Sequence, residues 1–256
     1  MNARFLILIA LASCVILSCG KMKPESPTPF ENPSAEGFDV AHSDPAAIEL
    51  ADSIMKAMGG RKNWDQTRFI SWNIFGNRNL VWDKHLDRVR IESLSDTTIY
   101  LLDMKTMKGR VQIKGQELTI PDSLNKMLSN AKSIWINDSY WLVMPFKLKD
   151  SGVTLKYLGE DTLKSGGRCN VLELTFANVG DTPQNKYNVF VDLKDNLVKQ
   201  WAYYNEASSD TANFIRPWDN YNLYGKILLS SDRSDDRGPK NVKVDEMLDD
   251  KLFLEF

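Results

Sequence analysis

The sequence has few residues that support covalent or metal chemistry. It holds 3 cysteines and 2 histidines in 256 residues. Neither His42 nor His85 has a second histidine, a cysteine or paired acids at metal-ligand spacing. A Gly-x-Ser-x-Gly elbow and a glycine-rich phosphate loop are also absent. We therefore expect no enzyme, no catalytic residue, no metal and no cofactor. The alternative is that His85 acts as a general base beside Asp83 and Asp87, although histidines in turns are usually only solvated.

The sequence also has no large excess of either positive or negative charge. The chain has 32 Lys and Arg against 34 Asp and Glu, a net charge of −2, with no block of like charge. Nucleic acids and anionic lipid head groups are bound by basic patches. We expect a monomer that binds neither.

No apolar run is long enough to cross a bilayer, which needs about 20 residues. Phe5 to Leu17 is apolar apart from Ser13 and follows Arg4, a pattern typical of a signal peptide. The sequence Ile16-Leu17-Ser18-Cys19 resembles the lipobox of bacterial lipoproteins. It predicts a signal peptide over residues 1–18 and lipidation of Cys19. An ordinary secretory signal with an incidental cysteine is the alternative.

The next segment, up to residue 43, is rich in proline and poor in large apolar residues. Such a composition cannot bury enough surface to order itself, so we expect residues 19–43 to be the lipidated cysteine and a flexible tether. Gly20-Lys21 after the cysteine lacks an aspartate that would favour the inner membrane. We expect an anchor in the outer membrane facing the periplasm, with surface exposure as the alternative. Only Cys169 then stays free, so no disulfide can form in the mature chain, and we expect Cys169 to be buried.

Residues 44–256 read as one domain. Asp44-Pro45 predicts the start of a helix that ends at Gly59-Gly60. Short alternating segments such as "RFISWNIF" and "DRVRIES", parted by turn residues, predict antiparallel strands before and after a helical insertion. The insertion begins at Pro121, and we expect Asn137-Asp138 to break it. The predicted fold is α+β: an incomplete, curved antiparallel β-barrel wrapped around an N-terminal helix and a helical insertion.

Four stretches carry a family resemblance: "ADSIMKAMGGRKNW", "FGNRNLVWDK", "NDSYWLVMPFKLKDSGV" and "WDNYNLYGKILLSSDR". They resemble exported Gram-negative lipoproteins related to the periplasmic lipoprotein carriers and outer-membrane lipoprotein receptors, the LolA/LolB-like superfamily. The resemblance implies a half-barrel closed by helices, with an apolar cavity that holds acyl chains in the carriers. The carriers are soluble, whereas Cys19 predicts a membrane anchor for this chain and so argues against a role as a soluble carrier.

Between Tyr140 and Phe146 the chain has more consecutive apolar and aromatic residues than one helix face can bury. Large, adaptable apolar side chains suit a lipid-binding lining. We expect a cavity for a lipid or a lipoprotein acyl chain, and the alternative for each residue is an ordinary place in the core. The expected cavity-lining residues are Trp72, Ile74, Trp141, Phe146 and Trp201.

A second class of function is also open. Aromatic side chains beside acids, at Trp82-Asp83 and Trp218-Asp219, suit stacking on sugar rings. Aromatic residues on strands are more often structural. Glycan binding or the docking of another envelope protein is therefore the alternative to lipid binding.

Overall fold

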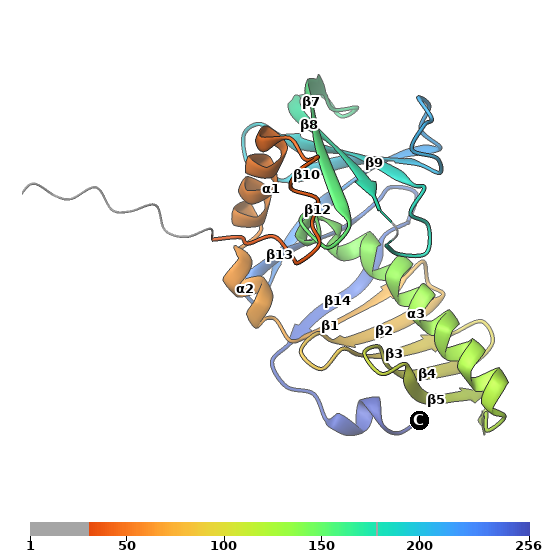
Figure 1. The fold of residues 1–256 in the computed structure, drawn as a ribbon. Coiled ribbons are helices and arrows are strands. Elements are labelled where there is room, and N and C mark those ends of the chain that lie inside the picture. The colour runs from red at the N-terminus through yellow and green to blue at the C-terminus, as the bar shows by residue number, and fades with distance from the viewer. Residues whose placement is uncertain (1–30, 178) are drawn as a thin grey trace, which may run out of the picture.

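The computed structural model describes residues 31–177 and 179–256 (Figure 1). The predicted signal peptide, Cys19 and the first part of the expected tether lie outside these ranges. Within them the chain forms two large antiparallel sheets, one separate hairpin and three α-helices. The sheets are open and curved, so the predicted incomplete α+β barrel is confirmed.

The first sheet has seven strands in the order β14-β1-β2-β3-β4-β5-β6. It is a meander of short hairpins, and the last strand of the chain joins it beside the first. Its strands are β1 (Phe69–Ile74), β2 (Arg78–Asp83), β3 (Arg88–Ser93), β4 (Thr98–Asp103), β5 (Lys108–Ile113), β6 (Gln116–Glu117) and β14 (Pro239–Asp245).

The second sheet has five strands in the order β11-β10-β9-β8-β7, and two further strands pair only with each other. The five are β7 (Val153–Thr162), β8 (Arg168–Phe176), β9 (Lys186–Asp192), β10 (Val198–Tyr204) and β11 (Phe214–Pro217), and the separate hairpin is β12 (Asp219–Tyr224) with β13 (Ile227–Asp232). Cys169 on β8 is fully buried, as expected.

Helix α1 (Pro45–Ala57) begins at the predicted proline and packs on β7. The Asp44 carboxylate does not cap the helix; it accepts hydrogen bonds from the amide of Tyr157 and the ammonium of Lys156, each at 3.0 Å. The short helix α2 (Arg61–Gln66) follows directly. Single turns of 3₁₀ helix, η1 (Met144–Phe146) and η2 (Asp250–Phe253), complete the helical elements described.

Helix α3 (Pro121–Val143) crosses one face of the seven-stranded sheet and reaches the second sheet with its C-terminal end (Figure 1). The predicted break at Asn137-Asp138 is wrong, because the helix runs through both residues. Asp138 is fully buried and pairs with Arg78 of β2, with Nε–Oδ2 and Nη2–Oδ1 distances of 2.7 and 3.0 Å. The Asp138 carboxylate is thus satisfied by Arg78 inside a continuous helix, and it does not have to cap the N-terminus of a new one.

The described part of the expected tether lies along the domain. The amides of Ala35, Asp39 and Asp44 donate to the carbonyls of Lys149, Val153 and Leu155 at 2.9 to 3.1 Å. Phe38 is buried with only 7% of its surface exposed. Residues 32–43 therefore pack with the domain, because their backbone finds partners beside β7.

Among the described residues, no helix combines the length and the apolar character needed to cross a membrane.

Candidate functional site

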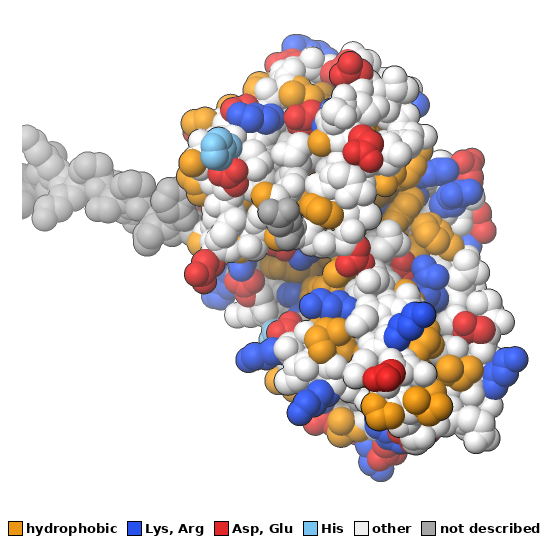
Figure 2. Space-filling model, turned by 45° about the vertical axis from the view of Figure 1, so that its right-hand side comes forward, with side chains coloured by type: hydrophobic (Ala, Val, Ile, Leu, Met, Phe, Trp, Pro, Cys, Tyr) orange, Lys and Arg blue, Asp and Glu red, His pale blue; other side chains and the backbone are white. Residues whose placement is uncertain are grey.

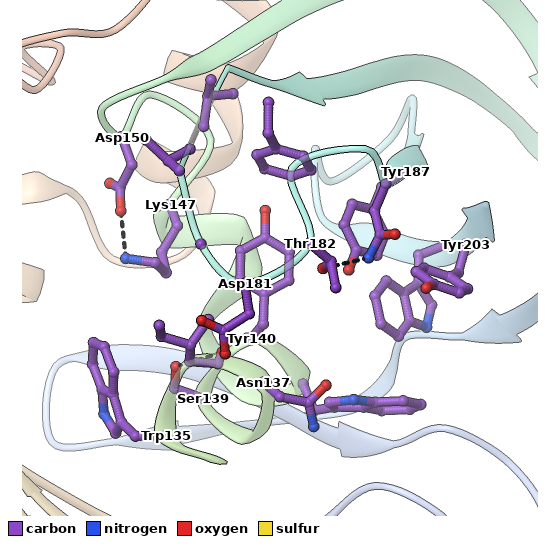
Figure 3. A pocket seen from close by; sticks show the side chains of 18 of the residues that line it. Trp135, Asn137, Ser139, Tyr140, Lys147, Asp150, Asp181, Thr182, Tyr187 and Tyr203 are labelled. Carbon is purple, nitrogen blue, oxygen red and sulfur yellow. Dashed lines mark hydrogen bonds and ion pairs between the residues drawn. The ribbon is translucent and has the colours of Figure 1, made fainter. Parts of the chain in front are cut away.

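The candidate site is a cavity of about 630 Å³ between the C-terminal part of α3 and the second sheet. Figure 3 shows α3 on one side and strands of the second sheet on the other. The segment from Lys147 to Val153 and the loop between β8 and β9 line the rest. Hydrophobic side chains are visible in a hollow between the upper and lower parts of the molecule in Figure 2. The volume falls in the range of small-molecule sites.

One wall of the cavity is aromatic. Trp201 and Tyr203 are two residues apart on β10 and so point to the same face of the sheet. Tyr187 of β9 and Phe214 of β11 stand opposite Tyr203 in the strand register. The Tyr187 ring stacks on Trp201 with centroids 5.4 Å apart, and the Phe214 ring stacks on Tyr203 at 5.0 Å. Neighbouring strands thus place four aromatic side chains on one continuous surface.

Helix α3 supplies the facing wall. The Trp141 ring meets Trp201 edge-on, with centroids 5.0 Å apart, and lies nearly parallel to Phe214 at 5.9 Å. Its backbone carbonyl accepts a hydrogen bond of 2.7 Å from Arg233. Arg233 is fully buried, and its guanidinium lies 3.4 Å from the centroid of Trp218. The end of α3 that carries Trp141 is therefore held by a contact outside the cavity.

Tyr140 occupies the middle of the cavity. Figure 3 shows its ring rising from α3 with the hydroxyl directed away from the helix. The ring centroid lies 5.4 Å from that of Tyr187 and 6.3 Å from that of Phe176. The hydroxyl is buried and has no hydrogen-bond partner among the described residues. Burial holds the pKa of Tyr140 well above its ordinary value, and an unsatisfied buried donor costs about 1–3 kcal/mol.

The lining has three charged side chains among its described residues: Lys147, Asp150 and Asp181. Lys147 is the one cation among the described lining residues, and it pairs with Asp150 (Figure 3). Asp181, on the loop between β8 and β9, adds a second carboxylate. Asn185 donates to the hydroxyl of Thr182 at 2.6 Å, which fixes the end of the same loop. The lining therefore carries a small excess of negative charge.

The structure divides the five predicted lining residues into two groups. Trp141 and Trp201 line the cavity and touch each other. Trp72, Ile74 and Phe146 are not among the cavity residues. Burial alone does not separate the two groups, because Trp201 is as little exposed as Trp72, at 2% each.

The three core residues have identifiable partners or positions. Trp72 and Ile74 are on β1, in the interior of the seven-stranded sheet, while the cavity is walled by the second sheet. Phe146 stacks on Trp64 of α2, with centroids 4.3 Å apart. Helix α2 has six residues and too little periodicity to be seen in the sequence.

Sequence reasoning did not assign Tyr187, Tyr203, Phe214 and Phe176 to the cavity. The alternation along β10 places Trp201 and Tyr203 on one face. Whether α3 packs against that face of β10 depends on contacts between distant parts of the chain. Local sequence patterns do not report such contacts.

The two aromatic–acid pairs proposed for sugar stacking are not available for it. Trp82 is 6% exposed and Trp218 is fully buried. Asp83 is also fully buried and is bound by Arg68 and Arg88 at 3.0 and 2.8 Å. Trp82, Asp83 and Trp218 are therefore structural.

The histidines have local partners. His85 Nε2 lies 2.9 Å from the carbonyl oxygen of Asp65, and His42 Nδ1 lies 2.9 Å from a carboxylate oxygen of Asp39. Among the described residues, no group of three or more His, Cys, Asp or Glu could hold a metal ion.

Solved structures of similar fold were found, whereas no protein-family model and no curated protein matches the chain. A DUF1329 family protein from Desulfovibrio piger shares 15% identity, covers 83% of this chain and 98% of its own, and has a TM-score of 0.43. A LolA superfamily protein from Nitrosomonas europaea shares 12% identity, with coverages of 82% and 97% and a TM-score of 0.41. A domain described as an outer membrane lipoprotein-sorting protein, from Vibrio parahaemolyticus, shares 9%, with coverages of 81% and 96% and a TM-score of 0.40.

One of these neighbours is a member of the LolA superfamily, to which four stretches of the sequence show a resemblance. At such identities and scores the likeness is one of general architecture, and no functional property passes from these proteins to this chain.

Proposed function

We propose that this protein binds a lipid or an acyl chain in the cavity between α3 and the second sheet. The observation that carries the proposal is the aromatic wall formed by Tyr187, Trp201, Tyr203 and Phe214, faced by Trp141, around about 630 Å³. A preformed concave site with an apolar lining and few charged groups favours an apolar ligand. The lining residues that the structure describes include no histidine and no cysteine, and we propose a binding protein and not an enzyme.

We further propose that the protein is a lipoprotein anchored through Cys19 in the outer membrane and facing the periplasm. Several acyl chains on one cysteine anchor a protein stably, because each buried CH₂ contributes about 0.8 kcal/mol. Intact mass and membrane fractionation of the wild type and of Cys19→Ala test the anchor. A Cys19→Ala protein of the wild-type mature mass that still fractionates with membranes would refute it, and rapid digestion by protease added to whole cells would place the domain on the surface.

Native mass spectrometry of the purified full chain tests the binding function. We expect a lipid that is lost on collisional activation, unlike acyl groups attached to Cys19, which stay on the chain. Trp141→Ala removes one wall of the cavity and should weaken lipid binding about tenfold or more, the effect of a buried aromatic anchor.

Leu223→Ala is the matched control, since Leu223 is an apolar side chain that lies outside the cavity and is 67% exposed. It should keep the bound lipid. The opposite result is a wild type that is purified without lipid and whose tryptophan fluorescence responds to oligosaccharides and not to acyl esters. That result would refute lipid binding and favour glycan binding. No response to either would favour a docking role toward another envelope protein.

A further inference from the structure

The turn between β1 and β2 carries a residue that does not suit its backbone. The amide of Asn77 donates to the carbonyl of Ile74 at 3.0 Å, which closes the turn. Its two central residues, Phe75 and Gly76, have φ values of 53° and 69°. Positive φ at both positions is the signature of a type I′ turn, which favours asparagine, aspartate or glycine at the first of them. Among the described residues, Phe75 is the only aromatic one at positive φ.

The strain at Phe75 is not required by the turn. The left-handed region is disfavoured for an ordinary residue by a factor of about 5 to 30, and a bulky side chain there is an outlier. The side-chain oxygen of Asn73 accepts a hydrogen bond of 2.8 Å from the amide of Gly76, so the turn is held without the ring of Phe75. Backbone strain of this kind collects at binding sites. The reason for a phenylalanine is therefore to be found in what its ring contacts.

The Phe75 ring contacts the wall of the cavity from behind. It meets the Trp141 ring edge-on, with centroids 5.0 Å apart and planes at 85°. Trp201 and Phe214 of the second sheet contact the same indole, at 5.0 and 5.9 Å. Phe75 is half-buried and is not one of the residues that line the cavity. The Trp141 ring is thus contacted by rings from both sheets.

The same hairpin also holds the helix that carries Trp141. Arg78, the first residue of β2, pairs with Asp138 of α3. Asp138 and Trp141 are three residues apart and so lie on the same side of the helix. The ion pair fixes the helix, and the Phe75 contact fixes the indole one turn further along.

We propose that Phe75 is a positioning residue for ligand binding, whose ring braces Trp141 so that this wall of the cavity is in place before an acyl chain enters. The proposal rests on the proposed acyl-binding function and adds to it a residue of the first sheet. Ordering one free side chain on binding weakens the affinity about 2- to 12-fold. A Trp141 ring that is already held avoids this loss.

Four variants separate the ring from the turn. Phe75→Asn removes the ring and leaves the Asn-Gly sequence that a type I′ turn favours, so the hairpin should be kept. Phe75→Gly also suits this turn and repeats the test with a different side chain. Phe75→Tyr keeps the ring. The matched control is Thr97→Asn, because Thr97 is an exposed residue with φ of 53° in the turn between β3 and β4, outside the cavity.

Two quantities are measured on the full chain. Titration with methyl laurate, followed by tryptophan fluorescence, gives the affinity. Fluorine NMR of the chain labelled with fluorotryptophan reports on the Trp141 ring, whose resonance is identified by its absence in Trp141→Phe. Urea unfolding of each variant defines conditions in which all of them are folded. A loss of global stability then moves neither quantity.

Phe75→Asn and Phe75→Gly should bind methyl laurate about fivefold more weakly than the wild type does. Without ligand their Trp141 resonance should be broadened or split, because the indole is no longer held, and it should narrow when methyl laurate is added. Phe75→Tyr and Thr97→Asn should match the wild type in affinity and in the Trp141 resonance.

The outcomes distinguish this proposal from the function on which it rests. A Trp141 resonance as narrow in Phe75→Asn and Phe75→Gly as in the wild type overturns the proposal, and so does wild-type affinity in variants whose resonance is broadened. The same changes in Thr97→Asn would also overturn it, because they would not depend on the Phe75 ring. A wild type that does not bind methyl laurate refutes the acyl-binding function itself, and the ligand-free resonance then shows separately whether Phe75 holds Trp141.

Discussion

Replacing Asp138 by alanine should destabilise the fold by about 3 kcal/mol. The carboxylate is fully buried and accepts two hydrogen bonds from Arg78 and a third, of 2.9 Å, from the side-chain amide of Asn137. Removing one partner of a buried ion pair costs about 3–5 kcal/mol. The Arg78 side chain is 26% exposed, so water can reach part of the guanidinium, and the lower end of that range applies.

A second pair of the same chemistry is the control. Arg110 and Glu117 also form a two-bond arginine–carboxylate pair, at 2.7 Å for each contact, but their side chains are 44% and 41% exposed. Exposed pairs contribute about 0.2–1 kcal/mol. Urea unfolding at neutral pH gives both values from the midpoint and slope, and Glu117→Ala should lose less than about 1 kcal/mol.

The variant Asp138→Asn distinguishes the buried ion pair seen in the structure from the helix-capping role that the sequence predicts for Asp138. Asparagine and aspartate cap a helix about equally well, so a cap would tolerate the exchange. A buried charge partner of Arg78 would not, and Asp138→Asn should lose about 2 kcal/mol or more, because it removes the countercharge of a partly buried guanidinium. Losses below about 1 kcal/mol for both Asp138 variants would refute the pairing.

Three further predictions concern stability. Tyr221→Phe should lose about 1 kcal/mol in urea unfolding because it removes a satisfied hydroxyl, whereas Tyr140→Phe should gain about 1 kcal/mol or more because it removes an unsatisfied buried one; an equal loss for both would mean that the Tyr140 hydroxyl has a partner. Burial lowers the pKa of Lys84 from 10.5 to about 8. Since the folded value is the lower one, the free energy of unfolding should rise by about 2 kcal/mol from pH 8 to about pH 9.5, and a Lys84→Met protein with the same pH profile as the wild type would contradict this. Trp72→Ala should lose about 3–5 kcal/mol in thermal and urea unfolding as a core residue, and a fully stable variant with weakened lipid binding would return Trp72 to the cavity lining.

Local sequence patterns were sufficient for the start of α1, for most strands and for one residue on each wall of the cavity, Trp141 and Trp201. The proline after Asp44 marks the start of α1, and period-two alternation marks β1 to β5 and places Trp201 and Tyr203 on one face of β10. The same kind of reasoning fails at Asp138, because a polar residue inside a helix is explained only by Arg78, sixty residues earlier in the chain.

The remainder of the site depends on long-range packing. Phe146 has the composition of a lining residue, but it is used in the stack on Trp64. Tyr187 and Phe214 become cavity residues through the register of β9 and β11 with β10. The composition of residues 32–43, poor in apolar groups, predicts a tether, whereas the backbone amides of Ala35 and Asp39 donate to the carbonyls of Lys149 and Val153.

Photocross-linking tests the central claim, that an acyl chain occupies the cavity between α3 and the second sheet. The full chain is equilibrated with a diazirine-bearing methyl ester of lauric acid, irradiated, digested and sequenced by mass spectrometry. We expect labelling in residues 135–141 of α3 and in residues 187–214 of the second sheet, reduced by excess unlabelled ester and by Trp141→Ala. Labelling confined to residues 45–120, or labelling that excess ester does not reduce, would contradict the account.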